Sequence, residues 1–230
     1  MSTDTFQTEE LFLLISAFGG DTLFGLPDRQ VFQLRGEEGF QRAYERLLDK
    51  QILDETGAMT DGGAIVVDAL SRYQACPSFV RLNQFMFGFS AEDTENAYLL
   101  VEVEAGKSYR FEVLDKVLIL QLLTNHFPLL QRDTPNVEQT FLTRPLTLDE
   151  RKRVSACEPD ERFISMEYFH VEETPMEEEN PAFYQQYFVV AWQDKLVAID
   201  VVRDDYKQVS GYWLWNELYR ELQFPVKEAL

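Results

Sequence analysis

The chain has 230 residues, of which 45% are hydrophobic, 13% aromatic and 27% charged, and this composition excludes a disordered or fibrous chain. Its 21 Lys and Arg against 40 Asp and Glu give a net charge of −19, with a sequence pI near 4.4. Because so negative a surface repels polyanions, we expect no nucleic-acid partner and no binding to an anionic membrane, whereas a basic or neutral protein partner is easily accommodated.

Three helices are predicted in the N-terminal third. The first begins near Thr8 and ends at Gly19 and Gly20. The second has apolar residues at i, i+3, i+4, i+7 and i+8, which are Phe40, Ala43, Tyr44, Leu47 and Leu48. The third runs from about Asp61 to Ala75 and stops before Pro77.

After Pro77 the apolar period changes to the alternation that is typical of strands. Three strands are predicted, at about 85–89, 99–103 and 109–113. A polar turn, Ser90 to Asn96, separates the first two, and a tight hairpin turn separates the second from the third. A helix from Leu114 to His126 follows and ends at a Phe-Pro pair. These strands are expected to form an antiparallel meander.

The C-terminal part repeats this order of elements. A loop rich in Pro and Thr (131–145) precedes a short helix with the capping-box spacing of Thr147 and Glu150. Three strands are then predicted, at 163–171, 183–192 and 196–202, with an acidic turn, Glu172 to Pro181, after the first. A final helix carries Tyr212, Trp215, Leu218, Tyr219 and Leu222, and it ends at a second Phe-Pro pair.

The predicted fold class is therefore α+β. It comprises an antiparallel or mixed β-sheet from two pseudo-repeated β-β-β-α halves, related by a quasi-two-fold, with helical bundles beside it and an N-terminal helical lead. We expect one domain over 1–230, with halves at about 1–130 and 146–230 and a linker at about 131–145. The repeat is one of element order, which chance could also produce.

The compartment predicted from the sequence is the cytoplasm, without membrane insertion. No run of residues approaches the roughly 18 apolar residues of a membrane span, and residues 1–10 carry no positive region before the apolar stretch. Cys76 and Cys157 could form at most one bridge, and two reduced thiols are the expectation.

Signatures of catalysis or metal binding are absent from the sequence. There is no glycine-rich phosphate loop, G-x-S-x-G, H-E-x-x-H or C-x-x-C motif. His126 at a helix end and His170 on a strand are expected to be structural. Glu177, Glu178 and Glu179 are consecutive and lack the ligand spacing of a calcium loop. We therefore expect no enzyme, no cofactor and no metal.

Two acidic turns occupy matching places in the two halves. They contain Glu92, Asp93 and Glu95 in the first turn, and Met176, Glu177, Glu178 and Glu179 in the second. Charged residues around a pliable methionine are found at adaptable binding surfaces. The alternative is that both turns are solvated loops that keep the sheet edges soluble.

The sequence resembles the EspG-type chaperones of type VII (ESX) secretion. The resemblance rests on the lead E-L-F-L-L-I-S-A-F-G-G followed by Leu26 and Pro27, the helix ending E-R-L-L-D-K-Q-I-L-D, the turn E-T-G-A-M, and then a helix, Pro77 and a β meander. It implies a cytosolic protein whose fold has a quasi-two-fold sheet flanked by helical bundles. It also implies that the loop Ser90–Asn96 and the helix Gly211–Leu222, with Tyr212, Trp215 and Tyr219, contact a substrate.

The function that this resemblance implies is a non-enzymatic, ATP-independent chaperone or adaptor. It would bind a helical secreted protein of the WXG/LXG or PE-PPE kind and keep it soluble and competent for export, because exposed apolar helix tips self-associate unless covered. The alternative is an acidic immunity protein that neutralises a basic, nuclease-like toxin. The sequence leaves the partner's identity and the oligomeric state open.

Overall fold

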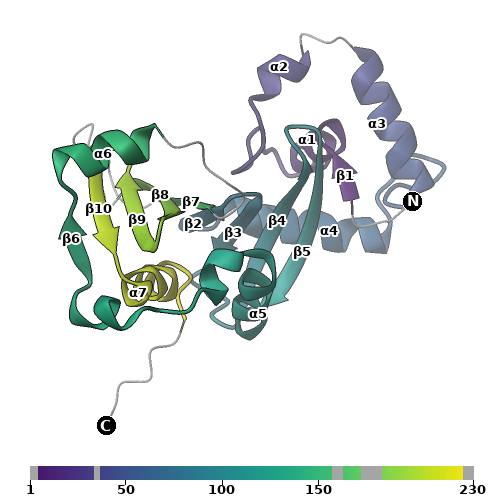
Figure 1. The fold of residues 1–230 in the computed structure, drawn as a ribbon. Coiled ribbons are helices and arrows are strands. Elements are labelled where there is room, and N and C mark those ends of the chain that lie inside the picture. The colour runs from purple at the N-terminus through teal and green to yellow at the C-terminus, as the bar shows by residue number, and fades with distance from the viewer. Residues whose placement is uncertain (1–4, 34–36, 157–162, 172–182, 225–230) are drawn as a thin grey trace. The chain divides into compact units, whose positions relative to one another are not determined.

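The computed structural model describes residues 5–33, 37–156, 163–171 and 183–224. Within these residues, seven α-helices and ten strands form the α+β fold that the sequence predicts (Figure 1). The strands make an antiparallel sheet in the order β1-β5-β4-β3-β2-β7-β8-β9-β10-β6. The chain divides into two compact units, unit 1 with residues 1–79 and 84–114 and unit 2 with residues 80–83 and 115–230.

Unit 1 contains the three helices and three strands that the sequence predicts, together with three shorter elements. Its elements are β1 (Thr5–Gln7), α1 (Thr8–Ser16), α2 (Arg29–Gln33), α3 (Glu37–Asp49), α4 (Asp61–Gln74), the start of β2 (Ser78–Leu82), β3 (Phe85–Phe89), β4 (Asn96–Glu104) and β5 (Ser108–Asp115). The unpredicted β1, α2 and β2 have only three to five residues each. Elements of that length are too short to show a period.

A buried carboxylate ties the first helix of unit 1 to the third. Glu10 is fully buried in α1, accepts a hydrogen bond from the Gln7 backbone N–H and lies 2.8 Å from Lys50 Nζ, just beyond the end of α3. Lys50 also donates to the Thr5 carbonyl and lies over the Phe6 ring. The pair therefore fastens β1, α1 and α3 together, with the charge of Glu10 compensated where water does not reach it.

Strand β3 lies at the centre of the unit 1 core. All five of its residues are buried, although the alternation of Phe85, Phe87 and Phe89 predicts one covered face. Gly88 lies against Tyr73 of α4, and a Cβ at this glycine would come within 2.7 Å of the Tyr73 ring. The strand therefore has both faces covered, as strands at the middle of a layered fold do.

Unit 2 contains a long connection that the sequence predicts to be a linker. Its elements are α5 (Lys116–His126), the 3-10 helices η1 (Pro128–Gln131) and η2 (Asn136–Thr140), β6 (Thr143–Pro145), α6 (Leu148–Ser155), β7 (Phe163–His170), β8 (Tyr184–Trp192), β9 (Lys195–Asp200), β10 (Asp205–Val209) and α7 (Gly211–Glu221). The stretch 131–145 thus holds η2 and β6, and β6 pairs with β10. Neither β6 nor β10 was expected, because both are short and largely polar.

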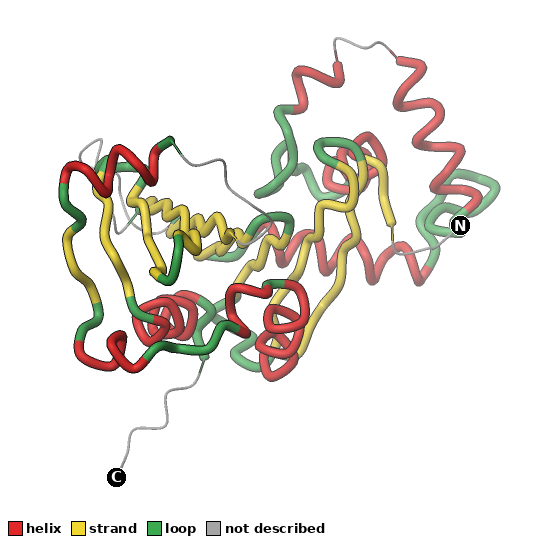
Figure 2. The backbone as a smooth tube through the Cα atoms, viewed as in Figure 1, coloured by secondary structure: helices red, strands yellow, loops and turns green. Residues whose placement is uncertain are grey.

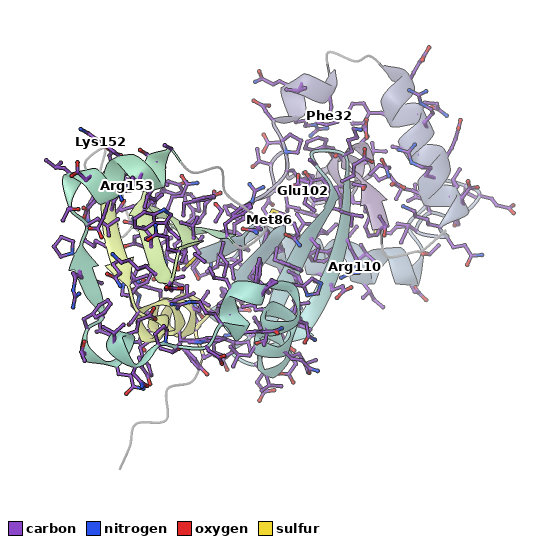
Figure 3. All side chains as sticks on the ribbon, viewed as in Figure 1. Phe32, Met86, Glu102, Arg110, Lys152 and Arg153 are labelled. Atoms are coloured by element: carbon purple, nitrogen blue, oxygen red, sulfur yellow. The ribbon has the colours of Figure 1, made fainter. Side chains whose placement is uncertain are left out.

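The two faces of the β7–β10 region are covered by different helices. Val154 of α6 packs with Trp192 and Val197, and the capping box of Thr147 and Glu150 starts α6 as predicted. The alternate strand residues, such as Tyr187 of β8, point to the other face of the sheet and lie under α7. Figure 2 shows α6 and α7 on either side of these strands, and Figure 3 labels Lys152 and Arg153, two exposed residues of α6.

The number of strands differs from the expected three in each half. Four consecutive strands, β2 to β5, follow one another in the sheet, as do β7 to β10, and an edge strand, β1 or β6, comes earlier in the chain than each set. The two units exchange at residues 79–80, 83–84 and 114–115, so β2 is divided between them. The halves at about 1–130 and 146–230 with a linker at about 131–145 stay predictions. The internal repeat and its quasi-two-fold stay predictions.

In the part of the chain that the structure describes, none of the helices combines the length and the apolar character that crossing a bilayer requires.

Replacing Gly88 by alanine tests the packing of β3. The added methyl would meet Tyr73 and, at 3.0 Å, the Cys76 sulfur, so we expect G88A to lower the free energy of unfolding by about 1–3 kcal/mol. The control is G62A in the exposed first turn of α4, where a methyl meets nothing closer than 3.9 Å and should be neutral or slightly stabilising. Urea unfolding followed by circular dichroism measures both, and equal midpoints would contradict the packing described.

Candidate partner-binding surface

The first turn of α7 is held by side chains from within the connection 131–145. Ser210 caps the helix by accepting a hydrogen bond from the Trp213 N–H, and Glu138 accepts one from the Gly211 N–H at 3.0 Å. Arg132 forms a two-point ion pair with Glu138 and donates to the Asp194 carbonyl in the β8–β9 turn. Since Glu138 is only 1% exposed, this carboxylate fixes the helix in a site with little screening by water.

The inner face of α7 mixes apolar and charged side chains. Leu214 and Leu218 are buried, and the Trp213 ring meets the edge of Tyr187 at 5.4 Å. Glu217 and Glu221 lie one turn apart with side chains only 11% and 10% exposed. Two buried carboxylates on one helix face repel each other unless a cation lies between them.

Arg220 is the cation that these two carboxylates share. It forms a two-point ion pair with Glu217 and donates from Nε to Glu221 at 2.8 Å. His170 of β7 lies on the far side of Glu221, with Nε2 at 3.2 Å from Oε2. We refer to Tyr168, His170, Glu217, Arg220 and Glu221 as the α7 seat.

Burial disfavours the charged forms of Glu217 and Tyr168 in the α7 seat. It raises the pKa of Glu217 above its ordinary 4.5, and the neighbouring Arg220 opposes that change only in part. Burial also raises the pKa of Tyr168 far above its usual range, and that of Tyr187 to about 12. Folding therefore favours the protonated form of Glu217, which is the opposite of what a well-compensated ion pair does.

The outer face of α7 carries the aromatic residues that the sequence analysis assigns to a partner. Tyr212 is 54% exposed, Tyr219 is 41% exposed and Trp215 is half-buried. The Trp215 and Tyr219 rings are 6.2 Å apart, and Tyr219 contacts Phe224. Their i, i+3 and i+7 spacing places the three rings on one stripe, which we call the aromatic stripe.

The first acidic turn belongs to unit 1, and one of its carboxylates maintains the turn itself. Asp93 is half-buried and accepts hydrogen bonds from the backbone N–H groups of Glu95 and Asn96. Glu92 and Glu95 are exposed. Asp93 is therefore assigned to loop geometry, and only the two glutamates extend into solvent.

The structure brings together only some of the predicted site residues. The aromatic stripe forms one surface in unit 2, whereas the turn with Glu92 and Glu95 belongs to unit 1. Met176, Glu177, Glu178 and Glu179 lie outside the described residues.

The whole chain, residues 1–230, matches the family described as domain of unknown function (DUF5081). The chain belongs to this family. It is also 26% identical over 139 residues to the Type VII secretion system protein EsaE of Staphylococcus aureus, from strains USA300 and NCTC 8325 / PS 47. The alignment covers 60% of this DUF5081 chain and 58% of EsaE. The similarity is to a type VII secretion protein, and the finer resemblance to EspG-type chaperones stays a prediction.

Sequence reasoning missed the residues that position α7 in this DUF5081 chain. Glu138 and Arg132 lie 73 and 79 positions before Gly211 in a stretch without a period, so no local pattern connects them with the helix. The N-terminus of a helix favours an acidic partner, but the sequence does not say which of 40 acids supplies it. His170 was expected to be structural, and its contact with Glu221 joins β7 to α7. His126 interacts with the Leu122 carbonyl in the last turn of α5, as predicted.

Removing the Glu138 carboxylate tests the anchoring of α7. E138A leaves the Gly211 N–H and the partly buried Arg132 without their partner, so we expect the free energy of unfolding to fall by about 2–4 kcal/mol. The control is D133A at an exposed position nearby, which should change stability by about 0.5 kcal/mol or less. Urea midpoints of the two variants compare these losses. Similar midpoints would show that Glu138 does not hold the helix.

Proposed function

We propose that this chain is a non-enzymatic chaperone or adaptor of type VII secretion that acts in the cytoplasm. It binds a helical secreted substrate of the WXG/LXG or PE-PPE kind and keeps it soluble and competent for export. The observation that carries the proposal is the aromatic stripe, three rings displayed on a helix whose opposite face is anchored. The similarity to a Type VII secretion system protein supports the pathway.

The aromatic stripe has the chemistry of a helix-docking surface. Tyr219 lies seven positions after Tyr212, so the stripe extends for about 10 Å, which is two turns of a facing helix. Tyrosine and tryptophan supply much contact area with little loss of rotamer entropy, and they dominate binding energy at many interfaces. A substrate helix with an aliphatic stripe would bury these rings and would itself be shielded from self-association.

The charge of the chain supports a protein partner with basic flanks. At −19, the chain attracts basic segments at long range, and exposed acids such as Glu92 and Glu95 steer rather than anchor a partner. An apolar contact at α7 therefore supplies affinity, and the acidic surface supplies the association rate. Under the alternative hypothesis, an immunity protein, charge would supply the affinity as well as the association rate.

Truncation of the aromatic stripe tests the proposal. The double variant W215A/Y219A should weaken binding to the cognate helical substrate at least about 10-fold, since interface aromatics commonly contribute more than about 1.4 kcal/mol. The matched control is N216A on the same exposed stretch of α7, which should bind like the unaltered protein. Isothermal titration of co-purified partners measures the affinities, and circular dichroism verifies folding.

Salt separates the two functions. Binding that survives 0.5 M NaCl and depends on Trp215 and Tyr219 is expected for the chaperone, because apolar contacts are not screened. Binding to a basic toxin that is lost in 0.5 M NaCl and unaffected by W215A/Y219A would replace the proposal with the immunity reading. Unchanged substrate affinity in the double variant would show that the aromatic stripe of α7 does not contribute to substrate binding.

A further inference from the structure

The α7 seat has more negative than positive charge in a buried place. Glu217 and Glu221 supply two carboxylates, while Arg220 supplies one permanent cation, whose own side chain is 62% exposed. His170 adds a second cation only when its imidazole is protonated. With a neutral imidazole the seat therefore holds one carboxylate too many, and buried uncompensated charge opposes docking of the helix.

Hydrogen bonding in the seat is incomplete as well. The Tyr168 hydroxyl is buried without a hydrogen-bond partner among the described residues, in the electrostatic range of Glu217 and Glu221. Gln185 pairs with Tyr168 in the β7–β8 register, and its buried Nε2 also has no partner in the described part of the chain. An unsatisfied buried donor destabilises the packed arrangement, because it has given up its hydrogen bond to water without replacement. Elements with such interfaces open more readily than apolar cores do.

The strands under α7 contribute ionisable groups as well. On β10, Asp205 and Lys207 line a small cavity with Tyr187 and Trp213 and pair with each other at 2.8 Å. Tyr168 and His170 face the seat from β7 and Tyr187 from β8. Asp200 of β9 is satisfied nearby, since it accepts from the Arg203 N–H at 3.0 Å and lies 3.9 Å from the Arg203 guanidinium. One proton added to the Glu217–Glu221 pair leaves one carboxylate against Arg220 and balances the group.

We propose that the α7 seat is a proton-operated latch, in which one proton from solvent on the Glu217–Glu221 pair tightens α7 against the sheet and its loss loosens the helix. Both carboxylates contact Arg220, so a proton on either one leaves a single carboxylate against that cation. Because burial raises the pKa of Glu217 in the folded state, the stabilisation of α7 is complete below the ordinary pKa of a glutamate and declines as pH rises through the folded-state pKa of Glu217. Above that pKa the helix that carries the aromatic stripe is held more loosely.

This latch would regulate the aromatic stripe, the surface assigned under the proposed function. Only this regulatory role rests on the proposed function. A partner that requires docked α7 would bind more tightly as pH falls, and its binding would draw a proton onto the seat by reciprocity. The latch itself is a property of the free protein.

Amide hydrogen exchange on the free protein tests the latch. After correction for intrinsic rates, the protection of the Leu214 and Leu218 amides, relative to Leu99 and Leu100 in β4, should fall at least about threefold between pH 5 and pH 7.5, within the limit of about tenfold per pH unit that a one-proton linkage sets. E217Q should flatten this profile. The matched control E167Q, a half-buried acid of β7 at a position between Met166 and Tyr168, should keep it.

Three results would overturn the latch. The first is protection of α7 that does not change with pH in the unaltered protein. The second is a pH profile of E217Q that is as steep as that of the unaltered protein. The third is a profile that H170Q flattens and E217Q does not, which would place the proton on the imidazole. If E217Q does not fold, E221Q takes its place, since it also removes one of the two carboxylates. Unchanged substrate affinity in W215A/Y219A, which would contradict the proposed function, leaves these exchange results standing, so the latch and the proposed function fail separately.

Discussion

The placement of α7 depends on carboxylates that are kept away from water. Glu138 holds its first turn through the Gly211 N–H, and Glu217 and Glu221 face the sheet, while Tyr212 and Tyr219 face solvent. Leu214 and Leu218 are buried on the inner face, as in an ordinary amphipathic helix, but the acids beside them are buried as well. Arg132, Arg220 and His170 contact these carboxylates where water would otherwise solvate them.

The sequence predicts long elements well and their neighbours poorly. The stripe of α3 and the capping box of α6 follow from spacing alone, and both are confirmed. Strands β6 and β10 carry no alternation of their own and exist because each completes the hydrogen bonding of a neighbour. Burial on both faces of β3 likewise depends on what covers the sheet, which a period of two does not encode.

The candidate site divides in the same way. Exposed aromatic positions on α7 can be identified from a helical period that places Leu214 and Leu218 on the other face. The α7 seat cannot, because it joins Tyr168 and His170 on a strand to acids about fifty residues later, and contact between them is created by the fold. Asp93 is the opposite case, because the sequence places it in an acidic binding loop. In the structure its carboxylate accepts hydrogen bonds from the backbone of its own turn.

The five buried residues of β3, Phe-Met-Phe-Gly-Phe, have a consequence for the nascent chain. A short uncharged segment of this kind is a template for intermolecular cross-β pairing whenever it is left open. In the finished protein β4 pairs along it and Tyr73 covers Gly88, so the hazard exists only before these contacts form. Acids lie close to this segment, Glu92 and Asp93 after β3 and Glu102 and Glu104 in β4. Charges beside an apolar strand oppose its pairing with other chains, so the negative charge of this chain bears on folding as well as on a partner.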